Sequence, residues 1–161
     1  MEVAGWVTKI LSVVWEGVTA VRAFFSSPQM EIVPTESFFG RLQGGQFAPL
    51  LKVRFRNESE RPVLVRSLRV EYAGTWHGPE NSAPTHLALH FFHGQHAIGT
   101  RPEEFITKAR RIPAVEEVER RAFYLLSQSE GNIPRDLPIT VEAVFSRGKT
   151  RRVPVTLHGP S

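Results

Sequence analysis

Apolar residues recur every three or four positions over the first 27 residues, and the pattern stops at Pro28. This spacing predicts an amphipathic helix over residues 1–27, because it places the apolar side chains on one face of an α-helix. Proline ends the helix because it lacks a backbone N–H. The stripe consists of Val3, Trp6, Val7, Ile10, Val14, Val18, Val21 and Phe25. A stripe of this size needs a cover, which we expect to be the rest of the chain, a second chain or a membrane surface.

Three charged residues interrupt this segment and argue against a membrane span. Lys9, Glu16 and Arg22 each cost about 2.5–3.5 kcal/mol near the centre of a bilayer. A cleaved signal peptide also fits poorly, because no basic stretch precedes the apolar run. The segment therefore suits docking or an in-plane position at a membrane surface better than it suits crossing one.

After Pro28 the apolar residues alternate with polar ones, which is the pattern of half-buried strands. The predicted strands cover residues 30–33, 51–57, 63–72, 87–91, 118–126, 139–145 and 153–157. The last two read as a hairpin, and a change of parity near Arg66–Ser67 indicates a bulge. Residues 116–121 also fit the start of a helix, but the bracketing turn residues favour a strand. Residues 74–84 read as a loop.

Seven or eight short strands separated by turn signals predict a single β-sandwich domain over residues 28–161. The alternation predicts which side chains face its interior, namely Val53, Phe55, Leu68, Val70, Leu89, Phe91, Val141, Phe145, Val153 and Val155. Twelve prolines spread through the chain disfavour long helices in this part.

Three segments carry a resemblance to a known layout: residues 24–32 (FFSSPQMEI), 51–57 (LKVRFRN) and 61–65 (RPVLV). The chain resembles uncharacterised bacterial proteins in which an N-terminal apolar helix precedes an immunoglobulin-like sandwich. The resemblance implies a mainly β fold, an immunoglobulin-like antiparallel β-sandwich with an N-terminal amphipathic α-helix, and proximity to a membrane. It implies no activity. Because the chain has no cysteine, an antibody-type domain with its Cys…Trp…Cys core is excluded.

The amino-acid composition excludes only a few functional classes. The absence of cysteine excludes disulfides, zinc–thiolate sites and a thiol nucleophile, and it fits a cytoplasmic location, with membrane association as the alternative. The net charge of +4 and the pI of about 10.0 are compatible with an anionic partner. We expect no cofactor.

A histidine cluster, His86, His90, His93 and His96, is the strongest candidate for a metal site. On a strand, His86 and His90 point the same way but lie about 13 Å apart at 3.3 Å per residue, so one ion cannot join them. We expect His93 and His96 to lie in a glycine-containing turn. The pattern therefore favours an exposed strand that runs into a histidine-rich loop, without a metal.

No catalytic motif is present. The chain lacks a nucleophile elbow, a phosphate-binding glycine loop and a His-Glu-x-x-His sequence, and Asp136 is its single aspartate. The acidic pairs and triplets near residues 103–119 alternate with arginines, which is typical of a solvated face. We therefore expect a protein that is not an enzyme.

Basic residues form the candidate contact surface for an anionic partner: Lys52, Arg54, Arg56, Arg147, Lys149, Arg151 and Arg152. If the two strands that carry them share one sheet, they form a cationic face for lipid or nucleic acid. Two hypotheses result. The first is an interaction or adapter module whose helix mediates self-association, docking to a protein partner or attachment to an anionic membrane surface. The second is a nucleic-acid-binding accessory protein that uses the arginine-rich strands.

Overall fold

The computed structural model describes residues 27–42, 44–80, 86–91, 94–99, 101, 104–106, 109–127, 134–146 and 149–159, with the strands at 86–91 and 94–99 described by their backbone alone. The predicted helix and the stripe residues from Val3 to Phe25 therefore lie outside the described residues. Within the described ranges the fold is mainly β and contains no α-helix. No helix in this part of the chain is long and apolar enough to cross a bilayer.

The described residues form eleven strands and one short 3₁₀ turn, η1. In chain order they are β1 Gln29–Ile32, η1 Pro34–Glu36, β2 Phe38–Arg41, β3 Phe47–Asn57, β4 Val63–Tyr72, β5 Thr75–His77, β6 His86–Phe91, β7 Gly94–Gly99, β8 Arg110–Ile112, β9 Glu116–Phe123, β10 Asp136–Phe145 and β11 Thr150–His158. The hairpin predicted near the C-terminal end of the sequence is confirmed as β10 and β11, which pair from Asp136↔His158 to Val144↔Thr150.

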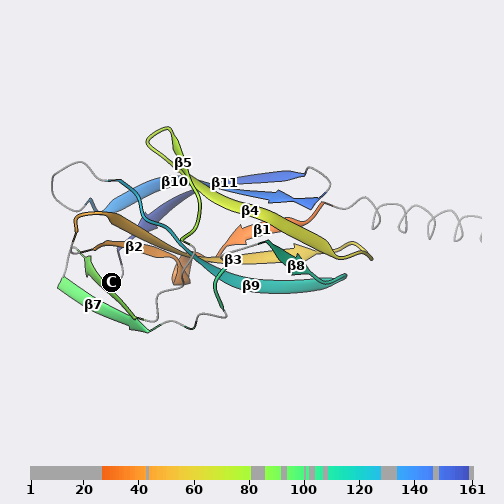
Figure 1. Cartoon of the computed structure of the whole chain (residues 1–161), viewed down its shortest axis with the longest axis horizontal. Coiled ribbons are helices and arrows are strands. Elements are labelled where there is room, and N and C mark those ends of the chain that lie inside the picture. Colours follow the sequence, from red (N-terminus) through yellow and green to blue (C-terminus); the bar gives the residue numbers. More distant parts are fainter. Residues whose placement is uncertain are drawn as a thin grey trace, which may run out of the picture.

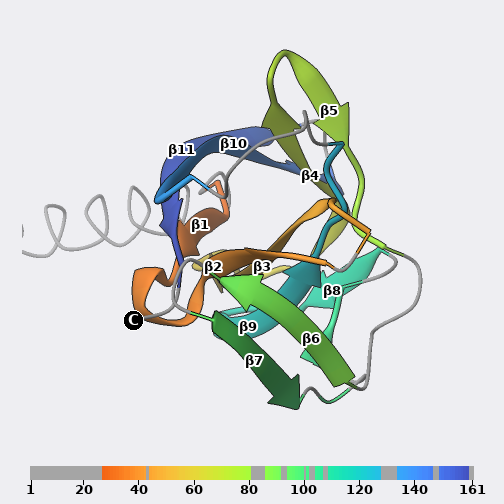
Figure 2. The same ribbon diagram turned by 90° about the vertical axis from the view of Figure 1, so that its left-hand side faces the viewer.

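The strands pair in the order β1-β3-β2-β11-β10-β4-β5, with β9 added to β3, β8 to β4, and β6 and β7 beyond β2. Among the described strands every strand-to-strand pairing is antiparallel except the contact between β11 and β2, which is a single parallel pair, His158↔Phe38. Outside these ladders Phe105 forms a parallel bridge to Arg121 of β9. Figure 1 shows β10 and β11 running alongside β4. In the turned view of Figure 2, β4, β5, β10 and β11 lie above and β2, β3 and β9 lie below, so the domain has two layers.

The hydrophobic core fills the space between these layers. Phe55 of β3 meets Phe145 of β10 edge to face, with ring centroids 6.0 Å apart. The predicted inward positions on β3, β4 and β10 are confirmed, since all six are at most 1% exposed: Val53, Phe55, Leu68, Val70, Val141 and Phe145. Val153 and Val155 are only half-buried at the edge of the core. Leu89 and Phe91 lie on β6, whose side chains are outside the described part.

The predicted bulge is confirmed in β4. Val144 of β10 pairs with Ser67, but the next residue, Phe145, pairs with Val65. Arg66 is therefore the extra residue, as the change of parity in the sequence indicated. The bulge lets Val65 and Leu68 both face the core although their positions have opposite parity.

Several elements differ from the sequence-based expectations. The segment near residue 116 is strand β9, so the helical alternative is wrong. Strand β5 lies inside the predicted loop, because the left-handed residues Ala73 (φ 48°) and Gly74 (φ 78°) reverse the chain tightly enough for β5 to pair with β4. His96 lies in β7 opposite Leu89, not in a turn. Strands β2 and β8 are short and do not alternate cleanly, so the pattern did not predict them.

Val115 has a backbone conformation that is unfavourable for its side chain. Its φ is 51° and its side chain is 71% exposed, so a β-branched residue occupies the left-handed region without a packing gain. We expect Val115→Asn to raise the free energy of unfolding by about 0.5–1 kcal/mol, because asparagine tolerates this conformation. Urea denaturation of both proteins checks this, and an unchanged or lowered stability would contradict it.

Candidate functional site

The basic side chains of β3 lie on its outer face, and glutamates meet each of them. The Lys52 ammonium lies 2.7 Å from Glu36 and 2.8 Å from Glu119. The Arg54 guanidinium contacts Glu119 at 2.8 Å and, at 3.2 Å, both Glu31 of β1 and Glu117 of β9. Glu117 is also the partner of the third base, Arg56, at 2.9 Å.

These ion pairs shift the pKa values of the residues that form them. Hydrogen bonds from Lys52 and Arg54 lower the pKa of Glu119, and the same bonds raise the pKa of Lys52 and of Arg54. The side chains remain partly exposed, so each pair stabilises the fold only modestly. The outer face of β3 therefore carries bases and acids together, and its positive charge is largely compensated.

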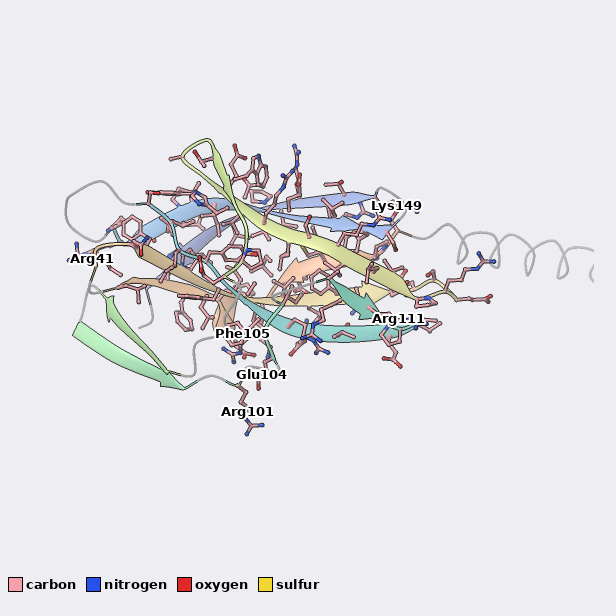
Figure 3. All side chains as sticks on the ribbon, viewed as in Figure 1. Arg41, Arg101, Glu104, Phe105, Arg111 and Lys149 are labelled. Carbon is pink, nitrogen blue, oxygen red and sulfur yellow. The ribbon has the colours of Figure 1, made fainter. Side chains whose placement is uncertain are left out.

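The basic residues near β11 are placed separately. The Arg151 guanidinium donates a hydrogen bond to the Pro28 carbonyl oxygen at 3.2 Å, beside the start of β1. Lys149 lies at the turn of the β10–β11 hairpin, at one end of the domain (Figure 3). Arg147 lies outside the described residues. The fourth residue, Arg152, pairs with Glu142 at 2.6 Å.

The structure does not bring the β3 and β11 basic residues into one surface. Arg54 points away from the core on the layer of Phe55, and Glu142, with its partner Arg152, points away from it on the layer of Phe145. Since these two phenylalanines face each other across the core, Arg152 and the basic residues of β3 face opposite sides of the molecule. Arg151 lies opposite the core residue Ala143 and reaches Pro28 beside β1, so it does not share the face of Arg152. Binding of an anionic surface by these residues stays a prediction, and it no longer concerns one continuous face.

A cluster that the sequence did not reveal joins four strands on the β10 layer. The Glu142 carboxylate is 1% exposed and accepts hydrogen bonds from Arg69 of β4 at 2.5 Å and from Arg152 of β11 at 2.6 Å. Trp76 of β5 covers both guanidinium groups, at 4.7 and 5.5 Å from the ring centroid. Burial raises the pKa of Glu142, but the bonds from Arg152 and Arg69 outweigh it and hold the pKa below its usual value.

An apolar groove of about 640 Å³ lies between β1 and β11. Its apolar lining includes Met30, Ile32, Val153, Val155 and Leu157. In the described part of the chain β1 pairs only with β3, and β11 reaches β2 only at its last residue, so the facing edges of β1 and β11 form no ladder. This open seam explains why the two valines of β11 are only half-buried.

Neither metal binding nor catalysis gains a candidate from the geometry. Within the described ranges no group of three or more histidine, aspartate or glutamate side chains could hold a metal ion. The side chains of His86, His90, His93 and His96 lie outside those ranges. The expected absence of a metal and of catalysis stays a prediction.

No protein-family model and no curated protein sequence matches the chain. Among solved structures, a candidate lipoprotein of Bacillus subtilis is similar at 12% identity and a TM-score of 0.49, covering 82% of this chain and 36% of that protein. The apo PCuAC domain of PmoF2 is similar at 13% identity and a TM-score of 0.45, covering 84% of this chain and 93% of that domain. Its copper-bound form gives 14% identity, a TM-score of 0.41, and 84% and 95% coverage. This chain thus spans about a third of the lipoprotein's length, and likeness at this level carries no argument about function.

Proposed function

We propose that this chain is a non-enzymatic interaction module. In this proposal residues 28–161 form an immunoglobulin-like antiparallel β-sandwich, and residues 1–27 form an amphipathic helix that is its binding element. The observation that supports it is the apolar groove between β1 and β11, which lies directly beside the point where the N-terminal segment enters the domain.

The groove fits the stripe of the N-terminal segment by position and by chemistry. Pro28 is fixed to Arg151, and Met30, two residues later, lines the groove. Pro28 ends the predicted helix, so the chain can turn there and the helix can reverse and lie along β11. Its valines and phenylalanines would then cover Val153 and Val155. We therefore name residues 1–26 of this chain as the occupant of the groove.

Two other partners of the helix would give different results in the same experiment. A second copy of the chain would accept the stripe in a dimer, and an anionic membrane would accept it at the surface. Arg151 lies beside Pro28, where the segment joins the domain, and positive charge at this point favours anionic headgroups. The proposed location is the cytoplasm, either free or at the membrane surface.

Binding of nucleic acid is the weaker proposal. The strand face that suggested it has a glutamate against each basic group, and its arginines are bound to carboxylates instead of free for phosphates. No contact among the described residues favours it.

Replacing Ile10 and Val14 by aspartate should release the helix, because both lie in the centre of its apolar stripe. We expect the wild-type chain to protect the amides of residues 3–25 from hydrogen exchange, and the Ile10→Asp/Val14→Asp variant to lose this protection. The matched control is Thr8→Asp/Ser12→Asp, which adds the same charge on the polar side of the helix and should retain it.

The mass and the lipid dependence identify the partner. If the amides of residues 3–25 are protected while the protein is a monomer, the result supports docking of the helix in the groove. If they are protected only while the protein is a dimer and exchange freely once the dimer dissociates, the partner is a second copy of the chain. Protection that appears only with phosphatidylserine vesicles identifies the membrane. If residues 3–25 exchange freely with and without vesicles, the segment is not a binding element and the proposal is wrong.

A further inference from the structure

Strand pairing along one edge of β4 is interrupted, and this leaves a gap between the two strands that pair with that edge. On this edge β8 pairs with Val63–Val65, and β5 pairs with Val70–Tyr72. Between them residues 66–69 meet neither strand, and this is the stretch that contains the Arg66 bulge. The Tyr124 hydroxyl donates a hydrogen bond to the Leu68 carbonyl oxygen at 3.2 Å and so satisfies one backbone group in the gap.

A pocket of about 480 Å³ lies over this gap. Its innermost lining residues are apolar and belong to the packed core, since Val65 and Leu68 are 1% exposed and Ile106 is 4% exposed. Its rim is polar and aromatic. The lining residues that carry a charge, a ring or a hydroxyl are Arg66, Ser67, Arg69, Trp76 and His77. Two arginines stand at the rim, of which Arg69 is paired with Glu142 and Arg66 is exposed.

Backbone hydrogen bonds hold the walls of the pocket in place. The segment that carries Gly78 and Pro79 is fixed by the Glu80 amide, which donates to the Phe123 carbonyl oxygen at 2.8 Å. Ile106, among the innermost lining residues, is fixed by its amide, which donates to the Arg121 carbonyl oxygen at 2.7 Å. The pocket is therefore a formed feature of the fold and not a gap between loose side chains.

The two arginines at the rim have N–H groups that bond to no other described residue. Arg69 bonds to Glu142 through its Nε alone, so its terminal nitrogens bond to no other described residue, and its plane lies over Trp76. Arg66 is exposed and bonds to no described residue. The Arg69 guanidinium, held by Glu142 and Trp76, is oriented for a carboxylate or phosphate, whereas Arg66 becomes ordered on binding.

We infer that this pocket binds a small organic anion, a carboxylate or phosphate attached to an apolar or aromatic group. The anionic group would meet Arg66 and Arg69, and the apolar group would lie against Trp76 and Pro79, which line the pocket and are partly exposed. The volume lies within the range of about 300–1,000 Å³ usual for small-molecule sites. This site is separate from the β1–β11 groove and does not depend on the proposed function.

Isothermal titration of the full-length chain with phenyl phosphate, inorganic phosphate and phenol tests this inference. Phenyl phosphate contains both parts of the proposed ligand, and the other two probes contain one part each. We expect saturable binding of phenyl phosphate, at least about tenfold tighter than either of the others, since a charge-assisted hydrogen bond or an apolar contact of this size accounts for such a factor. No saturable binding, or phosphate alone binding equally well, would overturn it.

Two single substitutions then locate the binding. Arg66→Ala should weaken phenyl phosphate binding about tenfold, and it removes no hydrogen bond to a described residue. Arg111→Ala is the matched control, because Arg111 is an exposed arginine on β8 that does not line the pocket (Figure 3). It should leave the affinity unchanged. Equal losses in the two variants would show attraction by net charge only and would overturn the site.

Tryptophan fluorescence provides a second way to locate the bound phenyl phosphate. The chain has three tryptophans, and two of them, Trp6 and Trp15, lie in the N-terminal segment. In a Trp6→Phe/Trp15→Phe chain, Trp76 is the only remaining indole and lies on the pocket rim. We expect phenyl phosphate to change its emission with the same dissociation constant as in calorimetry. Binding without any change at Trp76 would place the ligand elsewhere.

Discussion

Replacing both Arg69 and Arg152 by methionine is expected to lower the free energy of unfolding by about 3–5 kcal/mol at pH 7. Methionine keeps the apolar part of each side chain but removes the guanidinium. Glu142, which is 1% exposed, would then be a buried carboxylate without a charged partner. Leaving such a charge unpaired costs more than the pairs contribute, because burial removes its hydration.

The loss should depend on pH in a direction that the structure fixes. In the wild-type chain the pKa of Glu142 is lowered, so its stabilising effect is present above the unfolded-state pKa of about 4.3 and is lost as the pH falls through the folded value. In the double variant burial acts without the two arginines and raises the pKa, so the contribution of Glu142 to stability is most favourable at low pH and falls as the carboxyl ionises. The difference between the two proteins should therefore shrink on acidification from pH 7 towards pH 4.

Urea denaturation at several pH values measures both effects. A triple variant that also carries Glu142→Gln removes the buried charge and should recover most of the stability. Arg110→Met/Arg111→Met, which removes two exposed arginines of β8, is the control for net charge and should stay within about 0.5 kcal/mol of the wild type. A pH-independent loss, or one as small as that of the control, would mean that the cluster does not hold a buried charge.

Truncating Phe55 or Phe145 to alanine should lower the free energy of unfolding about as much as replacing Arg69 and Arg152 together. Phe55 and Phe145 are 1% and 0% exposed and come from different layers, so Phe55→Ala or Phe145→Ala leaves a cavity where the layers meet. The expected loss is about 3–5 kcal/mol for each, the range for buried aromatic residues. The edge-to-face contact predicts a coupling of about 0.5–1.5 kcal/mol in a double-mutant cycle.

The control for this pair is Leu64→Ala, since Leu64 is 36% exposed on β4. It should change the stability much less than either phenylalanine variant. If either phenylalanine variant stayed within about 0.5 kcal/mol of the wild type, the assignment of inward positions by alternation would be wrong.

The sequence predicted the parts of the fold that depend on local pattern. Strands β3 and β10 contain alternating runs of seven residues, and in β4 the Arg66 bulge leaves a change of parity that can be read directly. Strand β5 has only three residues, and it exists because a tight turn brings it back onto β4. Its own residues, Thr75–His77, carry no period long enough to recognise.

The candidate sites were harder to predict, because they depend on pairings between distant segments. The three basic residues on one face of β3 predicted a cationic surface. The register of the β3–β9 ladder instead places Glu119 opposite Arg54 and Glu117 opposite Arg56, across a sequence separation of more than 60 residues. The alternation of Glu117 and Glu119 was a usable signal, but only once β9 was known to pair with β3.

The burial of Glu142 had no such signal. The alternation of β10 assigns this residue to the outer face, where a glutamate is ordinarily exposed. It is covered because β4, β5 and β11 each contribute one long side chain above it. The number and identity of those neighbours follow from the tertiary fold and not from the local sequence.

Ionisation of the Tyr124 hydroxyl, which bonds to Leu68, also reports the rate at which the two layers of the domain separate. Of the two tyrosines only Tyr124 is completely buried, and burial raises the pKa of its phenol. Hydroxide cannot ionise this ring while the layers stay together. After a rapid jump to alkaline pH, the ultraviolet absorbance of the Tyr124 phenolate should therefore appear only at the rate at which the layers separate, which times unfolding without an added label.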